Sequence, residues 1–213
     1  GISFVTMLLD AFDSVSYQTH SDIPVADKIA TLQGLVKRYE DLEDEELQEA
    51  VLQKLLDKRP ADGYPRSQAT TDVLAEALTE VEAEQDAIAQ ALAAVNDYLT
   101  PANYDYAGAP EALEGHLAVL GLDVGEDSDY AALDKTAIGG KNRKTAVFYD
   151  LNQNKPDEGY DLATLTTYFN DMVATRLVTE ESMDLVNNAQ TIEDLEGISF
   201  VTMLLDAFDS VSY

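Results

Sequence analysis

Residues 67–99 read SQATTDVLAEALTEVEAEQDAIAQALAAVNDYL. The stretch is rich in Ala, Glu and Gln, and its apolar residues recur at three-to-four spacing, which is the pattern of an amphipathic helix. At about 1.5 Å per residue such a helix would be about 50 Å long, a length that suits a rod better than a compact globule. The apolar residues expected to face inward are Val73, Leu74, Leu78, Val81, Ile88, Leu92 and Val95.

The same periodicity predicts helices on both sides of this stretch. Ser, Thr and Asp residues at several of their starts are typical helix caps. No segment shows convincing alternation of apolar and polar residues, so a sheet is not expected. We therefore predict an all-α fold, with tandem helical bundles that form an extended rod or filament. The further expected helices cover residues 24–38, 44–59, 110–120, 143–152, 161–176, 179–189 and 191–211.

The sequence GISFVTMLLDAFDSVSY occurs twice, at residues 1–17 and again at residues 197–213. Chance cannot produce a match of this length. The chain therefore reads as one period of 196 residues followed by the start of the next, because the copies begin at residues 1 and 197. Two explanations stay open: a tandem array of near-identical repeats in a longer polymer, or an engineered, permuted chain with a duplicated terminal segment.

A weaker repeat lies inside the period and predicts two diverged modules, at residues 1–94 and 95–196, with residues 197–213 beginning the next period. The shared element reads as a helix that ends at a basic residue, then Pro, then a Gly-Tyr turn before the next helix. Val95-Asn96 and Val186-Asn187 recur at a similar distance. The matching positions, 96 residues apart, are Ala50-Val51, Leu55, Arg59-Pro60 and Gly63-Tyr64 in the first module and Ala146-Val147, Leu151, Lys155-Pro156 and Gly159-Tyr160 in the second.

One predicted helix crosses the period boundary. Thr191 is its expected cap, with Asp194 at the third helical position, and the helix runs on through Gly197. Residues 1–17 lack this cap, so they are predicted to be a truncated copy of the same junction helix. The residues expected to pack at the junction are Phe4, Met7, Leu8 and Phe12 in the first copy and Phe200, Met203, Leu204 and Phe208 in the second.

Composition excludes several classes of function. The chain has 213 residues, with 13 Lys and Arg against 41 Asp and Glu and a formal net charge of −28, whereas nucleic-acid binding needs clustered basic residues. No apolar run is long enough to span a bilayer. There is no cysteine, and the two histidines, His20 and His116, have no partner at metal-ligand spacing. We therefore expect no enzyme activity.

The strongest candidate site is DLNQNKPDEGYD, at residues 150–161, which resembles a calcium-binding loop in its ligand spacing. However, Lys155 stands at position 6, where glycine is needed, and position 12 is the shorter Asp. We interpret the segment as the helix end and turn shared by both modules, and keep calcium as the minor alternative; no other cofactor is expected. The candidate ligands at positions 1, 3, 5, 9 and 12 are Asp150, Asn152, Asn154, Glu158 and Asp161.

Two other charged clusters have simple interpretations. Residues 123–129 (DVGEDSD) are expected to form a solvated acidic loop, with weak ion binding as the alternative. Residues 141–144 (KNRK) form the one basic cluster and contain no phosphate-binding glycine pattern. In so acidic a chain we expect them to form ion pairs.

Residues 185–193, LVNNAQTIE, followed by an apolar helix, resemble the GA module of Gram-positive surface proteins. That family is a three-helix bundle whose best-known members bind serum albumin, and the matching stretch joins its second and third helices. The match covers about residues 161–209. Gln190 replaces the usual Lys, Asp194 replaces the usual Gly, and the aromatic residues that precede the second helix in albumin binders are absent around residues 181–183. The resemblance implies the bundle, without albumin binding.

The wider pattern Ala-Val…Leu…(Lys/Arg)-Pro-x-x-Gly-Tyr looks like the helical modules repeated in large cell-wall or S-layer-associated proteins of Gram-positive bacteria. It implies a structural repeat unit of a long extracellular or cell-surface fibre, whose partners are neighbouring repeats or subunits of the same protein. The alternative is a helical binding module that captures a host or partner protein. Such a module should expose an aromatic patch, for instance around Tyr98, Tyr104 and Tyr106, and a spacer should not.

Overall fold

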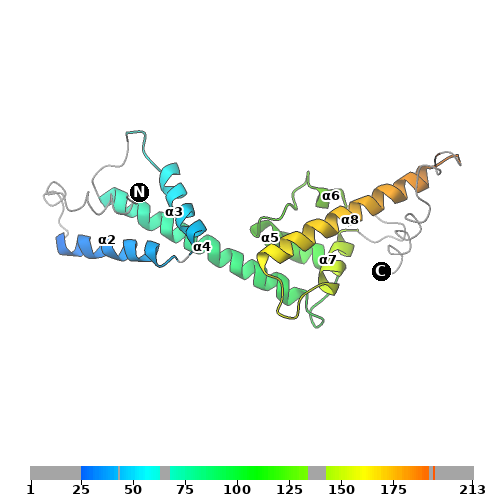
Figure 1. The fold of residues 1–213 in the computed structure, drawn as a ribbon, viewed down its shortest axis with the longest axis horizontal. Coiled ribbons are helices and arrows are strands. Elements are labelled where there is room, and N and C mark those ends of the chain that lie inside the picture. Colours follow the sequence, from blue (N-terminus) through cyan, green and yellow to red (C-terminus); the bar gives the residue numbers. More distant parts are fainter. Residues whose placement is uncertain (1–24, 43, 63–67, 134–142, 192–193, 195–213) are drawn as a thin grey trace. The chain divides into compact units, whose positions relative to one another are not determined.

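A computed structural model describes residues 25–42, 44–62, 68–133, 143–191 and 194 of the chain. These residues form seven helices and no strand, which confirms the all-α prediction (Figure 1). The helices are α2 (Val25–Glu40), α3 (Glu45–Asp57), α4 (Gln68–Tyr98), α5 (Ala109–Val119), α6 (Asp129–Ala132), α7 (Lys144–Gln153) and α8 (Leu162–Asn188).

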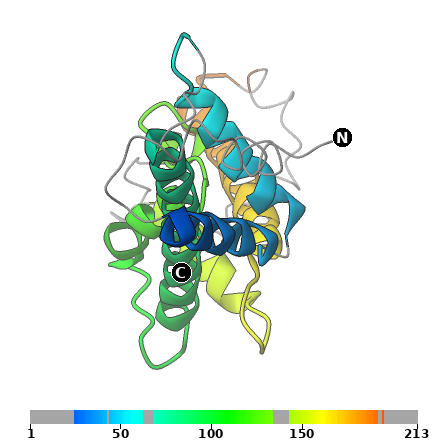
Figure 2. The same ribbon diagram turned by 90° about the vertical axis from the view of Figure 1, so that its left-hand side faces the viewer.

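The chain divides into two compact units, Gly1–Asp86 and Ala87–Tyr213, and the division falls inside the uninterrupted helix α4. In the first unit, apolar residues of α2, α3 and the first half of α4 pack together; Figure 2 shows these three helices from the end at which α2 lies. The core of this unit consists of Leu35, Val36, Tyr39, Val51, Leu55, Leu74, Ala77, Leu78 and Val81.

Ion pairs cross from α3 to α4 beside this core. The sequence places Lys54 and Lys58 at the end of α3, where cations suit the helix dipole. In the structure their ammonium groups reach α4: Lys54 Nζ lies 2.7 Å from Glu84 Oε1, and Lys58 Nζ lies 2.7 Å from Glu80 Oε1. These pairs are partly exposed, so each contributes little to stability and mainly supports the pairing of the two helices.

The second unit has a larger core, built from the second half of α4, from α5, α6 and α7, and from the first half of α8. The short helix α6 was not predicted. Ser128 caps it by accepting a hydrogen bond from Ala131 N at 3.0 Å, and this places Tyr130 in the core against Phe148 and Phe169. The most buried large side chains of this unit are Leu99, Leu113, Leu117, Tyr130, Leu133, Phe148, Leu151, Leu165 and Phe169.

Helix α4 matches its prediction to within one residue at each end. Of the residues expected to face inward, Leu74, Leu78, Val81 and Val95 are buried, and the others are half-buried. Between the two buried sets, no residue from Glu82 to Ala87 is buried. The first half of α4 therefore serves one core and the second half serves the other.

The two helices expected over residues 161–176 and 179–189 are one continuous helix, α8, and the prediction that Thr179 caps a separate helix is wrong. The Thr179 hydroxyl donates to Thr175 O at 3.0 Å, within the helix, and the residue is 8% exposed. A threonine hydroxyl satisfied in this way does not end a helix. Neither Gly nor Pro occurs between Leu162 and Asn188, so nothing in the chain forces the break that the GA resemblance implies.

The predicted cap after α8 is confirmed. Asp194 N donates to Thr191 Oγ1 at 3.2 Å, and Thr191 N donates to Asp194 Oδ2 at 2.9 Å, which is the reciprocal exchange of a capping box. The rest of that helix and the repeated segments, residues 1–17 and 197–213, lie outside the described residues, and so do all the junction packing residues predicted on them.

The weaker internal repeat is visible as matching structure. Helix α3 ends at Asp57 and α7 ends at Gln153, 96 positions later. Val51 and its counterpart Val147 are both fully buried, and Leu55 and Leu151 are 2% and 0% exposed. In each unit a short helix therefore presents the same two residues to the core before the chain enters a long helix.

Candidate functional site: the end of α4 and the α7–α8 turn

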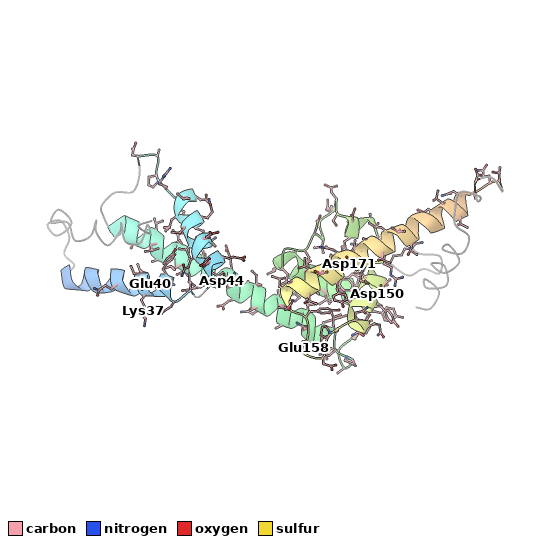
Figure 3. All side chains as sticks on the ribbon, in the orientation of Figure 1. Lys37, Glu40, Asp44, Asp150, Glu158 and Asp171 are labelled. Atoms are coloured by element: carbon pink, nitrogen blue, oxygen red, sulfur yellow. The ribbon has the colours of Figure 1, made fainter. Side chains whose placement is uncertain are left out.

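The segment singled out as a calcium loop forms the end of α7, a turn and the start of α8. Figure 3 labels Asp150 on α7 and Glu158 in the turn. Helix α7 ends at Gln153, and the turn is closed by a hydrogen bond from Gly159 N to Pro156 O at 2.9 Å. The segment therefore contains the helix end and the turn that the internal repeat predicts.

Asp150 forms a bidentate ion pair with Arg176 of α8. Arg176 Nε lies 2.9 Å from Asp150 Oδ2, and its Nη2 lies 2.9 and 2.7 Å from Oδ1 and Oδ2. The two side chains are only 15% and 11% exposed. A paired, hydrogen-bonded charge is tolerated at this depth, whereas a lone one would be costly. The carboxylate of Asp150 thus joins α7 to α8.

The other candidate ligands also have protein partners or face solvent. Asn152 Nδ2 donates to Leu99 O at 2.9 Å, and Asn154 Nδ2 donates to Asp150 O at 2.9 Å. Asp161 caps α8 by accepting from Thr164 N at 2.7 Å, and that backbone hydrogen bond holds the pKa of its carboxyl below the ordinary value. Glu158 is exposed.

No group of three or more His, Asp or Glu side chains among the described residues is arranged to hold a metal ion. Asp150 and Asp161, the first and last positions of the candidate loop, serve two different structural contacts. Calcium binding stays a prediction, and it would require rearrangement of these bonds.

A different contact at this place was not anticipated from the sequence. The side chain of Asn96, at the end of α4, bonds the backbone of the α7–α8 turn on both sides: its Oδ1 accepts from Tyr160 N at 2.7 Å, and its Nδ2 donates to Tyr160 O at 2.8 Å. Lys155 Nζ donates to the Asn96 carbonyl at 2.5 Å. Tyr160 is itself buried, and its hydroxyl donates to Leu151 O at 2.7 Å.

Gly159 makes this contact possible. Its φ of +88° lies in the left-handed region, and a Cβ there would lie 2.9 Å from Asn96 Oδ1. The repeated Lys/Arg-Pro-x-x-Gly-Tyr pattern therefore has a physical meaning in this unit: the basic residue and the tyrosine backbone bind the end of the preceding long helix, and the glycine lets that helix approach. The sequence drew attention to Asn96, because Val95-Asn96 recurs as Val186-Asn187. It did not indicate that Asn96 contacts the α7–α8 turn.

The tyrosines named as a possible exposed patch are half-buried and contact one another or nearby backbone. The Tyr98 hydroxyl donates to Asp105 O at 2.8 Å, and the ring of Tyr106 lies 6.1 Å from that of Tyr104 and 6.4 Å from that of Tyr149. Burial raises the pKa of the Tyr104 hydroxyl. These rings complete the second unit and do not form an exposed aromatic surface.

The described part of the basic cluster forms an ion pair beside the core of the second unit. Lys144 pairs with Glu114 at 3.2 Å and lies 4.6 Å from the centre of the Tyr130 ring, which confirms the ion-pairing interpretation for this part of the basic cluster. Residues 141 and 142 lie outside the described residues, as does His20, and His116 is exposed on α5.

The acidic loop before α6 forms a local turn. Gly125 N donates to Asp123 Oδ1 at 3.3 Å, and the Ser128 hydroxyl donates to Gly125 O at 2.6 Å. Asp123 and Asp127 line a hollow of about 350 Å³ beside α8.

Among the described helices, none combines the length and apolar character needed to cross a membrane. No protein-family model, curated protein or solved structure matches this chain.

Proposed function

We propose that this chain is a structural repeat unit of a long extracellular or cell-surface fibre, such as a stalk, adhesin spacer, filament or surface layer, related to the tandem helical-repeat proteins of Gram-positive cell walls. The observation that carries the proposal is the recurrence of a short helix followed by a shared sequence pattern and a long helix. The ends of α3 and α7, each followed in sequence by the same (Lys/Arg)-Pro-x-x-Gly-Tyr pattern and then by a long helix, lie 96 residues apart within a sequence whose own period is 196 residues. Repeats of this kind bury apolar faces on their neighbours.

Helix α4 supports this function because it belongs to both units. It supplies Leu74, Leu78 and Val81 to one core and Val95 and Leu99 to the other, so no loop separates the two units at this point. A shared helix resists bending, whereas a flexible linker does not. The net charge of −28 adds repulsion between repeats, which opposes collapse and non-specific association.

The alternative, a helical module that captures a host or partner protein, receives less support. The tyrosines that would form its contact surface, Tyr98, Tyr104 and Tyr106, are half-buried in their own unit.

The test is the solution size of chains that contain one, two and three periods of 196 residues. We expect the maximum dimension from small-angle X-ray scattering to grow by a constant increment per period. A matched control replaces Ala83–Asp86 of α4, which are exposed, with Gly and Ser residues, and it should shorten the average dimension without removing either core. Growth of the unaltered chains only as the cube root of length would overturn the proposal.

A second measurement addresses the natural polymer. The mass of the protein from its source, determined under denaturing conditions, should be several times that of the 213-residue chain if the repeats are covalently joined. A mass equal to that of one period would instead indicate a fibre assembled from subunits or a permuted chain, and would contradict the covalent array.

A further inference from the structure

The internal repeat relates two ion pairs of opposite polarity. Lys54 of α3 and Asp150 of α7 occupy equivalent positions, 96 residues apart. In the first unit the cation is on the short helix, and Lys54 Nζ lies 2.7 Å from Glu84 Oε1 and 3.5 Å from Glu80 Oε2 on α4. In the second unit the anion is on the short helix, and Asp150 pairs with Arg176 of α8 at 2.7 Å. The direction of the ion pair is therefore reversed between the two units.

The reversal includes the long helices. Arg176 of α8 stands 96 residues after Glu80 of α4, so the partners of the two short helices are also related by the repeat. A second cation of the first unit, Lys58, lies 3.0 Å from Glu76 and 2.7 Å from Glu80. Its counterpart in the second unit is the uncharged Asn154. The end of α3 thus offers two cations to an acidic helix, whereas α7 offers an anion to an arginine.

Two buried apolar positions of the short helices give no basis for telling them apart. Val51 and Leu55 of α3 recur as Val147 and Leu151 of α7, and all four side chains are buried in their cores. In an array, copies of both units stand close together while they fold. Exchange of equivalent elements between neighbours is a characteristic failure of repeat proteins. A charge difference at equivalent positions can oppose this exchange.

We propose that the reversed polarity of these ion pairs keeps each short helix paired with a long helix of its own kind in the array. This inference rests on the proposed repeat function. Helix α3 placed against α8 would bring Lys54 next to Arg176. Helix α7 placed against α4 would bring Asp150 next to Glu80. Both exchanges set like charges side by side, which suppresses the wrong pairing.

The site in the second unit has the stronger discrimination. The Arg176 and Asp150 side chains are 11% and 15% exposed, whereas those of Lys54 and Glu80 are 22% and 38% exposed. Charges that are nearly buried are screened less by water and salt. A lysine brought to the place of Asp150 would leave the Arg176 guanidinium beside a second cation at this depth, which is costly.

The experiment uses the full chain with two changes at one ion pair. Asp150→Arg/Arg176→Asp keeps a pair but gives the second unit the polarity of the first, and Asp150→Leu/Arg176→Met removes both charges. The matched control, Arg38→Glu/Glu82→Arg, reverses a partly exposed pair that joins α2 to α4 and includes no residue of α3 or α7. Circular dichroism checks that each variant stays helical.

The measurement detects helices exchanged between chains. Equal amounts of ordinary and isotope-labelled chains are unfolded together in urea and refolded over a range of concentrations. A carbodiimide then joins amines to carboxylates that are in contact. Mass spectrometry counts the mixed-isotope links between the Lys54 or Lys58 amine of one chain and α8 of another, and sedimentation velocity measures the dimer fraction. Both variants keep Phe148, so its difference in size from its counterpart Leu52 cannot account for a change.

We expect few mixed links in the parent and in Arg38→Glu/Glu82→Arg. The variant Asp150→Arg/Arg176→Asp should form at least about tenfold more of them, rising with concentration, because like charges no longer oppose the exchange. Some of these links should join Lys54 to the carboxylate introduced at position 176. The neutral variant Asp150→Leu/Arg176→Met should also exchange more than the parent, with a larger dimer fraction.

A folded Asp150→Arg/Arg176→Asp chain with no more mixed links than the parent would overturn the proposal. If that variant loses its helices, the neutral variant decides, and a mixed-link count equal to that of the parent contradicts the proposal. These failures are distinct from failure of the proposed function. If tandem periods still extend by constant increments in solution scattering, the fibre unit stands and only the role of the reversed ion pairs is wrong.

Discussion

Gly159 is the residue at which conformation and contact are most tightly linked. Its left-handed φ of +88° turns the chain towards Tyr160, and the missing Cβ leaves room for Asn96 Oδ1. Any other residue would meet both a backbone penalty and a steric one. The Gly-Tyr pair was recognisable from sequence as a turn, whereas the asparagine that it receives comes from 63 residues earlier and could not be assigned without the fold.

We predict that Gly159→Ala lowers the free energy of unfolding by more than about 1–2 kcal/mol, the backbone cost alone. Gly115→Ala is the control, because Gly115 lies in α5 and a Cβ added there would have nothing within 4 Å. There alanine should stabilise the protein by about 0.5–1 kcal/mol, since it improves helix propensity. Urea unfolding measures both changes, and a Gly159→Ala chain as stable as the parent would contradict the steric argument.

The ion pair of Asp150 and Arg176 gives a second prediction. Asp150→Asn should destabilise the second unit by about 2–3 kcal/mol, because it removes the negative charge of a nearly buried bidentate ion pair. The double variant Asp150→Leu/Arg176→Met should cost less than the single one, since neither charge remains. Chemical denaturation of the parent and both variants decides the point. Equal losses in the single and double variants would show that the loss of charge balance between the two side chains is not the source of the cost.

The calcium alternative needs a variant that does not disturb this ion pair. Glu158 is exposed and serves for this purpose. We expect calcium at millimolar concentration to leave the melting temperature of the parent and of Glu158→Gln nearly equal and unchanged. A clear rise in the parent that disappears in Glu158→Gln would establish a calcium loop and overturn our interpretation of residues 150–161 as a structural turn.

At the scale of elements, the sequence predicts most helices well because their apolar spacing and caps are local properties. Asp44 caps α3, accepting from Glu46 N at 2.9 Å, as expected from its position before the helix. Thr179 shows why one boundary was wrong. A threonine followed by two glutamates looks the same before a helix and within one, and only the hydroxyl bond to Thr175 O distinguishes them.

The Asp161 cap predicts a pH dependence for α8. Because its pKa is lowered in the folded chain, the cap contributes stability above the ordinary carboxyl pKa and loses it as pH falls through the folded value. We expect Asp161→Asn, which retains an acceptor but does not titrate, to melt below the parent at neutral pH and to approach it below about pH 3. Melting temperatures measured by circular dichroism test this, and parallel pH curves would contradict it.

At the scale of the whole molecule, the property with a testable effect on stability is the large negative net charge. The formal net charge of −28 on 213 residues produces self-repulsion that the few ion pairs, such as Lys54 with Glu84, offset only locally. We predict that raising sodium chloride from about 0.01 to 0.5 M increases the melting temperature, because salt screens this repulsion over distances beyond a few ångströms. A fall in melting temperature over this range would show that the attractive pairs outweigh the general repulsion.

The sequence repeat itself was readable without any structure, since identity over residues 1–17 and 197–213 needs no physical argument. In contrast, the sequence did not show that the two halves of α4 contribute to different cores. Periodicity marked one apolar stripe from Val73 to Val95, and it gave no sign that the stripe belongs to two cores separated by the unburied residues 82–87.

This unburied stretch of α4 has a consequence for how such a chain can change. Substitutions from Glu82 to Ala87 touch neither core, so many helix-forming residues would serve at positions other than Glu82 and Glu84, which pair with Arg38 and Lys54. An inserted or deleted residue is a different matter, because it rotates everything that follows by about 100° and shifts it by about 1.5 Å along the helix axis. The helical phase between the residues of α4 that enter the first core and those that enter the second therefore depends on the length of this stretch, whereas its described ion pairs constrain composition only at Glu82 and Glu84.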